Sequence, residues 1–160
     1  MIPISVGYAV PDFELPSTGN KLFRLMDFRG SYVVLYFYPK DNTPGCTQEG
    51  QTFRDNIDRF TALNAVIVGV SRDTVRVHEG FKAKQEFPFE LLSDSDETLC
   101  HLFDVIKLKN MYGKQVRGIA RSTFLVDPDG VLVCEWRKVK VKGHSDEILE
   151  ALDKLAGERL

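Results

Sequence analysis

An almost unbroken run of β-branched and aromatic residues from Tyr32 to Tyr38 most constrains how this chain folds. Such a run is typical of a strand that is buried on both faces of a sheet. Pro39 ends the strand, because proline has no amide hydrogen to donate to a neighbouring strand. A helix is predicted to begin at Pro44 or Gly45 with Thr43 as its N-cap, since proline is favoured at the first helical position.

Cys46 falls in the first turn of this predicted helix. Amide hydrogens and the positive end of the helix dipole stabilise an anion there, and the thiolate is the nucleophilic form of cysteine. A lone cysteine is usually a small buried hydrophobic residue, but Cys46 lies among proline, glycine and threonine rather than in an apolar stripe. It is therefore a candidate nucleophile. Further along, Phe53, Ile57 and Phe60 repeat at helical spacing and are predicted to face a core.

Strands and helices alternate along most of the chain, which predicts an α/β fold with a central mixed sheet and helices on both faces. The predicted strands are Phe13 to Leu15 and Lys21 to Leu25, which form an N-terminal hairpin, Ala65 to Val70, Phe89 to Leu92, and a second hairpin of Thr123 to Val126 and Val131 to Trp136. The later helices are predicted at Thr74 to Gln85, Asp96 to Phe103 and Ser145 to Leu155. With 160 residues, the chain is expected to form one domain over residues 1–160. The segment from Asn110 to Gly118 is expected to be a mobile loop.

The order of Pro39, Thr43 and Cys46 resembles the proline, threonine and cysteine motif of the peroxiredoxins. The string FYPKDNTPGCTQEG is similar to their Q-type, or bacterioferritin-comigratory, subfamily. The similarity covers nearly the whole chain, continuing through Val68 to Asp73, Leu91 to Asp94, Tyr112-Gly113 and Arg121 to Leu125. It implies a thioredoxin-like fold and a thiol-dependent peroxidase that reduces hydrogen peroxide and organic hydroperoxides.

The resemblance also implies that Cys46 is the peroxidatic cysteine and that Pro39, Thr43 and Arg121 complete its pocket. The chemistry independently favours these residue types. The guanidinium of Arg121 offers fixed donors and a permanent charge, so it can hold the thiolate and orient the peroxide oxygens. The Thr43 hydroxyl can accept from the peroxide and donate to the thiolate, while Pro39 can shield the thiolate from water. Taken alone, Arg121 would be interpreted as a surface charge and Thr43 as a helix cap.

A sulfenic acid at Cys46 must be resolved by a second thiol, from within the chain or from outside. In Q-type relatives the resolving cysteine commonly lies five residues beyond the peroxidatic one or on the next helix. This chain has Gln51 and Lys82 at those places, so it departs from the two-cysteine pattern.

The other two cysteines are predicted to be structural. Cys100 is flanked by apolar residues of a helix, and Cys134 alternates with Leu132 and Trp136 on one strand face. We therefore expect a one-cysteine peroxidase that needs an external thiol, such as thioredoxin, glutaredoxin or a small thiol. The alternatives are an atypical two-cysteine enzyme resolved by Cys100, and a redox-sensing or chaperone-like protein without turnover.

The composition of the chain excludes only a few other classes of function, and it gives no support to any of them. A net charge of −2 gives no reason to expect nucleic acid, and no apolar run is long enough for a membrane span. The three histidines, His78, His101 and His144, are scattered, so no metal site is expected, and no cofactor motif is present. An odd number of cysteines fits a reducing compartment, and we expect a cytoplasmic protein. The resemblance adds that it is a monomer.

Overall fold

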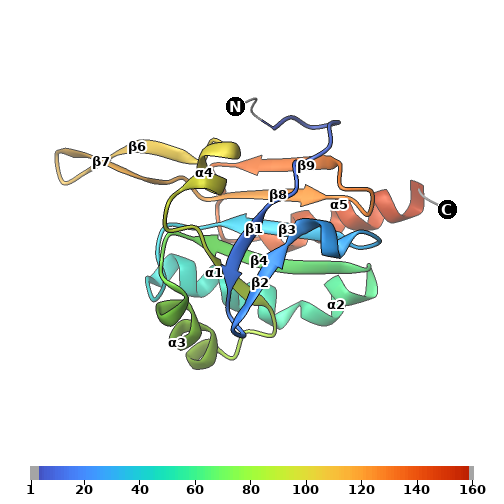
Figure 1. The fold of residues 1–160 in the computed structure, drawn as a ribbon, viewed down its shortest axis with the longest axis horizontal. Coiled ribbons are helices and arrows are strands. Elements are labelled where there is room, and N and C mark those ends of the chain that lie inside the picture. Colours follow the sequence, from blue (N-terminus) through green and yellow to red (C-terminus); the bar gives the residue numbers. More distant parts are fainter. Residues whose placement is uncertain (1–3, 159–160) are drawn as a thin grey trace.

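The predicted buried strand lies near the middle of a seven-stranded mixed sheet in the computed structural model, which describes residues 4–158 (Figure 1). β3 (Tyr32–Phe37) pairs in parallel with β4 (Ala65–Ser71) and antiparallel with β8 (Ser122–Val126). The strand order is β2-β1-β5-β4-β3-β8-β9, where β1 is Glu14–Ser17, β2 is Lys21–Arg24, β5 is Glu90–Ser93 and β9 is Leu132–Arg137. All residues of β3 are buried, as expected for a strand covered on both faces.

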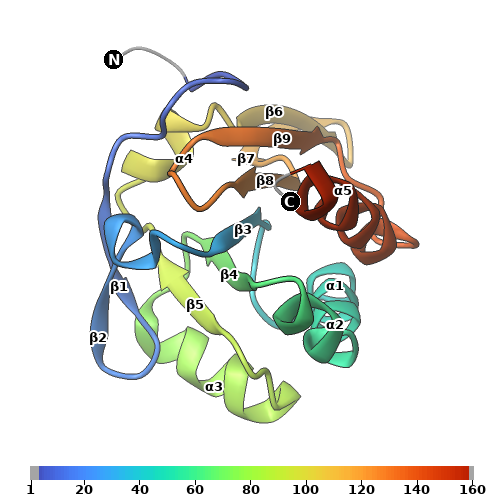
Figure 2. The ribbon, with the colours of Figure 1, turned by 90° about the vertical axis from the view of Figure 1, so that its right-hand side faces the viewer.

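Side chains of β3 alternate between two hydrophobic clusters, one on each side of the sheet. We call these sides the Phe37 face, which also buries Leu35, and the Tyr36 face, which also buries Val34. Side chains of α1 (Pro44–Asp55), α2 (Ile57–Ala62), α3 (Val75–Gln85) and α5 (His144–Glu158) pack on the Tyr36 face. Those of the 3-10 helix η1 (Leu25–Phe28) and of α4 (Thr98–Leu102) pack on the Phe37 face. Figure 2 shows α4 on the other side of the sheet from α1 and α5.

Most predicted elements are confirmed, with small differences at their ends. The N-terminal hairpin is formed by β1 and β2, and it joins the main sheet through the pairing of Ser17 with Leu92. α3 begins after Thr74, whose hydroxyl accepts a hydrogen bond from the amide of Val77. The short helix α4 is held by the Asp94 carboxylate, which accepts from two amides of its first turn.

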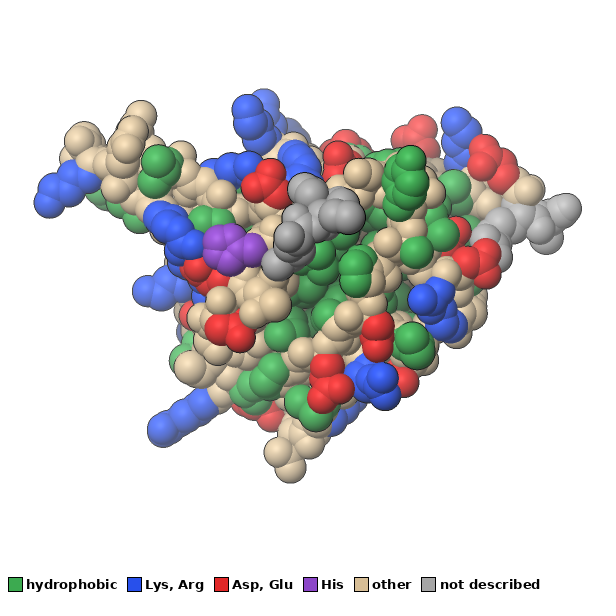
Figure 3. Space-filling view, turned by 45° about the horizontal axis from the view of Figure 1, so that its top comes forward, with side chains coloured by type: hydrophobic (Ala, Val, Ile, Leu, Met, Phe, Trp, Pro, Cys, Tyr) green, Lys and Arg blue, Asp and Glu red, His purple; other side chains and the backbone are tan. Residues whose placement is uncertain are grey.

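The prediction of a mobile loop from Asn110 to Gly118 is wrong. The structure has a two-stranded antiparallel hairpin there, β6 (Ile106–Met111) and β7 (Lys114–Ile119), which projects from the body in Figure 1. Tyr112 and Gly113 form its two-residue turn, both with positive φ, which is the geometry that suits a tight hairpin. Figure 3 shows basic side chains along this projection, and Lys114 and Arg117 are exposed.

The backbone changes course at two places that the pattern did not predict. Phe53, Ile57 and Phe60 pack on the Tyr36 face, as predicted, but the helix that carries them is interrupted at Asn56, which separates α1 from α2. In β9 a bulge shifts the register, so that Leu125 pairs with Cys134 while Val126 pairs with Leu132.

The alternation predicted that Cys134 shares a face with Leu132, and this prediction is wrong. Leu132 packs on the Phe37 face, whereas Cys134 and Trp136 pack on the Tyr36 face.

Within residues 4–158, no helix has both the length and the apolar character needed to cross a membrane.

Candidate active site

Cys46 lies in the first turn of α1, as predicted, and its side chain is only 2% exposed. Pro44 is the first helical residue, and Thr43 has the extended backbone of an N-cap. The amides of Gly45 and Cys46 have no acceptor within the helix, because the first intrahelical bond runs from Thr47 to the Thr43 carbonyl. These free amides and the positive end of the helix dipole lie at the turn that carries Cys46.

Arg121 reaches Cys46 from the neighbouring strand β8. Ser122 pairs with Phe37, so Arg121 lies at the end of the sheet where the chain leaves β3. Its Nη2 donates to the Sγ of Cys46 at 3.5 Å. A Cβ on Gly45 would lie 3.1 Å from the same Nη2, so the missing side chain of this glycine is what lets the guanidinium approach the helix.

Glu49 is a site residue that sequence reasoning missed. It lies one helical turn after Cys46, is 1% exposed, and accepts a hydrogen bond from Arg121 Nη1 at 2.5 Å. Burial raises the pKa of Glu49 from 4.5 to about 7, although Arg121 opposes this shift. The i, i+3 spacing from Cys46 was the available signal, because it places both side chains on one face of the helix.

The Thr43 side chain is oriented differently from the expectation. Its hydroxyl donates to the carbonyl of Lys40 at 2.7 Å, and it makes no side-chain cap. Thr43 is therefore the N-cap residue of α1 by position, as predicted, but its hydroxyl does not cap the helix. With its hydrogen directed to Lys40, the hydroxyl can accept a hydrogen bond but does not donate to sulfur. Pro39 is half-buried and lies two residues after the end of β3. The catalytic roles of Cys46, Thr43, Arg121 and Pro39 stay predictions.

The other cysteines lie in different surroundings. Cys100 is buried on the Phe37 face, so the sheet lies between it and Cys46 on the Tyr36 face. Burial and the nearby Asp94 carboxylate raise the pKa of the Cys100 thiol. Cys134 is half-buried on the Tyr36 face, and burial raises its pKa as well.

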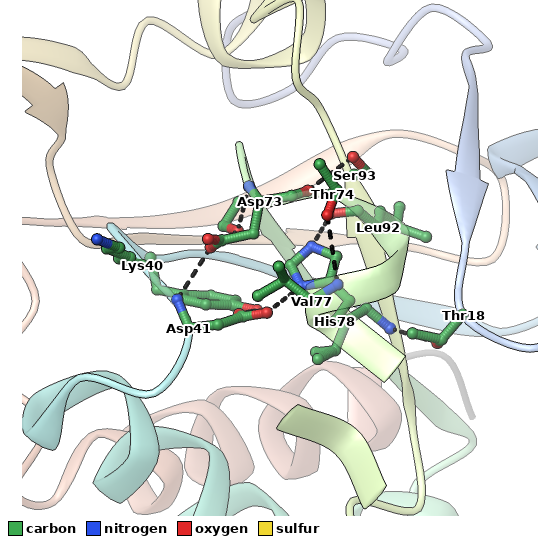
Figure 4. A network of polar contacts seen from close by, with 12 residues as sticks. Thr18, Lys40, Asp41, Asp73, Thr74, Val77, His78, Leu92 and Ser93 are labelled. Carbon is green, nitrogen blue, oxygen red and sulfur yellow. Dashed lines mark hydrogen bonds and ion pairs between the residues drawn. The ribbon is translucent and has the colours of Figure 1, made fainter. Parts of the chain in front are cut away.

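One cluster of described residues has the composition of a metal site. Oxygen and nitrogen atoms of Asp41, Asp73 and His78 lie within 4.8 Å of one another (Figure 4). These atoms are already used, because Asp41 Oδ2 contacts His78 Nδ1 at 2.5 Å and Asp73 Oδ2 accepts from Ser71 and from the Asp41 amide. A cation would have to break these bonds, so the cluster fits a hydrogen-bond network better than a metal site.

A groove of about 520 Å³ lies elsewhere, between the N-terminal hairpin and the strands β4 and β5. Phe23, Val66 and Phe89 are among its lining residues, and none of the predicted site residues is. We place the reactive site at Cys46 because the polar and charged groups converge there and not in the groove.

Comparisons with known proteins agree with this geometry. The AhpC/TSA family model matches residues 6–134. The chain is 55% identical to peroxiredoxin Bcp of Xanthomonas campestris over 141 residues, covering 88% of each chain. It is 51% identical to peroxiredoxin Bcp of Bacillus subtilis over 149 residues, covering 93% of this chain and 95% of that one.

Solved structures are similar as well. A structure of the bacterioferritin comigratory protein of X. campestris, described with its alkyl peroxide reduction activity, superposes with a TM-score of 0.85 at 53% identity, covering 90% of this chain and 92% of that one. A mutant of the Xylella fastidiosa peroxiredoxin Q superposes with a TM-score of 0.91 at 45% identity, covering 98% and 99%. The chain has the thioredoxin-like fold of these proteins. It belongs to the AhpC/TSA family as a peroxiredoxin of the Bcp or Q type, and is thus a thiol-dependent peroxidase.

Proposed function

We propose that this enzyme reduces alkyl hydroperoxides and hydrogen peroxide through Cys46 alone, and that an external thiol restores it. The observation that carries the proposal is the chain of contacts from Cys46 Sγ to Arg121 and from Arg121 to Glu49 at the start of α1. It gives one sulfur a permanent cation and a helix N-terminus together. Reduction of alkyl peroxides is also the activity named for the X. campestris relative.

The reaction is a displacement at oxygen. The Cys46 thiolate attacks the terminal oxygen of ROOH, the S–O bond forms as the O–O bond breaks, and the leaving alkoxide takes a proton to become ROH. The product is a sulfenic acid, CysSOH. An external thiol then attacks its sulfur, releasing water and forming a mixed disulfide, and a second thiol releases Cys46 in the reduced form.

Each site residue has a part in this displacement. Arg121 holds the thiolate through Nη2 and can offer further N–H groups to the peroxide oxygens. Thr43 accepts a hydrogen bond from the peroxide O–H, because its own hydrogen is directed to Lys40. Pro39 limits the access of water. Glu49 fixes the orientation of the guanidinium by accepting from Nη1.

Three features support a one-cysteine cycle. The places of a resolving cysteine hold Gln51, whose amide donates to Gln85, and Lys82, which forms an ion pair with Glu90. Cys100 is fully buried on the opposite side of the sheet, and its raised pKa disfavours the thiolate that would attack a sulfenic acid. Cys134 is on the same side as Cys46 but lies on β9, beyond β8.

The test is mass spectrometry of the reduced protein after one equivalent of cumene hydroperoxide, with and without dimedone. We expect a sulfenic acid that dimedone traps at Cys46, and no internal disulfide. Cys46→Ser should abolish peroxide consumption in the presence of dithiothreitol. Non-reducing peptide mapping that finds a dominant Cys46–Cys100 bridge would replace this proposal with a two-cysteine cycle. A single turnover with excess thiol would instead indicate a sensor.

A further inference from the structure

A buried residue, Asp41, connects the loop between β3 and α1 to neighbouring elements through hydrogen bonds. Its side chain is completely buried and accepts from the hydroxyl of Tyr38 at 2.6 Å through Oδ1. Its Oδ2 contacts His78 Nδ1 at 2.5 Å, and its amide donates to Asp73 at 2.9 Å (Figure 4). A carboxylate is costly to bury, so its two partners, Tyr38 directly after β3 and His78 on α3, indicate a specific role.

His78 completes the attachment from the other side. Its ring is also completely buried, and Nε2 lies 2.9 Å from the carbonyl of Leu92 on β5. A carbonyl can only accept, so Nε2 carries a hydrogen. A second hydrogen lies between His78 Nδ1 and the Asp41 carboxyl, bound to one or the other. In either case the net charge of the two side chains together is zero. The pair thus links the loop to α3 and β5 without leaving a net buried charge.

The attached loop is the one that carries the catalytic groups. Lys40, directly before Asp41, provides the carbonyl to which the Thr43 hydroxyl donates at 2.7 Å. Asn42, directly after Asp41, has a φ of 64°, in the left-handed region that asparagine adopts more readily than most residues, so the chain can turn there towards Thr43. Thr43 then leads into the first turn of α1 and Cys46. A shift of Asp41 would therefore move both ends of the Lys40–Thr43 hydrogen bond.

Resting on the proposed function, we propose that Asp41 and His78 form a positioning pair, which holds the Thr43 hydroxyl in place for the attack of Cys46 on the peroxide. Neither residue touches the reacting atoms. Their contribution comes through the geometry of the loop, and displacements of about 1 Å at such a site can cost on the order of a hundredfold in rate.

Two substitutions of His78 separate this role from a general structural one. In His78→Asn the amide nitrogen takes the place of Nδ1 and can still donate to Asp41, whereas the bond to Leu92 is lost. In His78→Gln the amide nitrogen takes the place of Nε2, so the bond to Leu92 remains and the bond to Asp41 is lost. Both variants remove the same ring and the same titratable group, so each is the matched control of the other.

The measurement is the second-order rate constant of the reduced enzyme with cumene hydroperoxide, from stopped-flow mixing, beside the free energy of unfolding. We expect His78→Gln to react at least about tenfold more slowly, and His78→Asn to stay within about threefold of the natural protein. Equal losses in the two variants, or a larger loss in His78→Asn, would overturn the inference.

A double-mutant cycle with Thr43→Val tests whether the effect passes through Thr43. Positioning predicts that His78→Gln costs little further rate once the hydroxyl is absent, whereas independent effects would multiply and contradict the proposal. If His78→Gln does not fold, Asp41→Asn takes its place, because it can accept from Tyr38 and donate to neutral His78. We expect it to stay within about threefold of the natural rate, and a tenfold loss would count against the positioning pair. A reaction that persists in Cys46→Ser would refute the proposed function instead.

Discussion

Replacing Glu49 by glutamine should change how the stability of this protein depends on pH. Glu49 is 1% exposed, and its Oε2 has no hydrogen-bond partner among the described residues. Burial therefore disfavours the ionised carboxylate and raises the pKa of Glu49 from 4.5 to about 7, even with Arg121 beside it. Glu49→Gln keeps the oxygen that accepts from Arg121 but cannot ionise.

The sign and the size follow from proton linkage. Between pH 4.5 and 7 the folded protein keeps the Glu49 proton while the unfolded chain releases it, so the folded state binds more protons. The contribution of Glu49 to stability is therefore fully present below pH 4.5 and is lost as the pH rises to about 7. At about 1.4 kcal/mol for each pH unit, the loss amounts to about 3 kcal/mol, a large part of the stability of a domain. The Glu49→Gln variant should not show this loss of stability between pH 4.5 and 7.

Urea unfolding of both proteins at a series of pH values gives the required difference, because titrations common to both cancel. We expect nearly equal free energies of unfolding at pH 4.5, and a Glu49→Gln variant more stable by about 3 kcal/mol at pH 8. The m-values should agree, which confirms that the same surface unfolds. A difference that stays constant within about 0.5 kcal/mol over this range would refute the reasoning.

The remaining predictions concern the rate of peroxide reduction, measured by stopped-flow with reduced enzyme. Thr43→Val should lower the second-order rate constant by about a hundredfold with little change in stability, because it removes a hydroxyl and keeps the shape. Arg121→Lys should lower the rate at least about tenfold, since lysine retains the charge but cannot bridge sulfur and carboxylate with a planar fork; an unchanged rate would show that the charge alone suffices. Gly45→Ala should slow the reaction, because its Cβ would lie 3.1 Å from Arg121 Nη2, and a crystal structure should show the guanidinium displaced. Cys134→Ser should leave the rate unchanged, and a marked loss would reveal a part for this thiol that its place on β9 does not suggest.

Much of the fold could be predicted because local and long-range signals agree. The run that became β3 is apolar on both faces and is followed by proline, so pattern and turn chemistry give the same answer. Thr74 caps α3, and the Asp94 carboxylate accepts from two amides in the first turn of α4. The start of α1, and with it the place of Cys46, follows from the same kind of signal.

The failures come from features that a pattern of side chains does not determine. The β6–β7 hairpin is mostly exposed, so no buried face marks its strands, and its turn depends on Tyr112 adopting a positive φ. The bulge before Cys134 moves every later residue of β9 to the other face, and one extra residue leaves no periodic signal. Glu49 was missed because its role depends on Arg121, which is distant in sequence and arrives only through the β3–β8 pairing.

The position of the sheet between Cys46 and Cys100 has a consequence for the peroxidase cycle. The sequence predicted Cys46 at the start of one helix and Cys100 as a structural residue of another, but only the structure shows that α1 and α4 pack against opposite faces. On the Tyr36 face the Arg121 guanidinium donates to the Cys46 sulfur in the first turn of α1. On the Phe37 face burial and the Asp94 carboxylate raise the pKa of the Cys100 thiol, which disfavours its thiolate. For the two sulfurs to meet, α4 would have to leave its packing around Phe103, which is fully buried. We therefore expect the sulfenic acid to outlast any internal attack until an external thiol arrives.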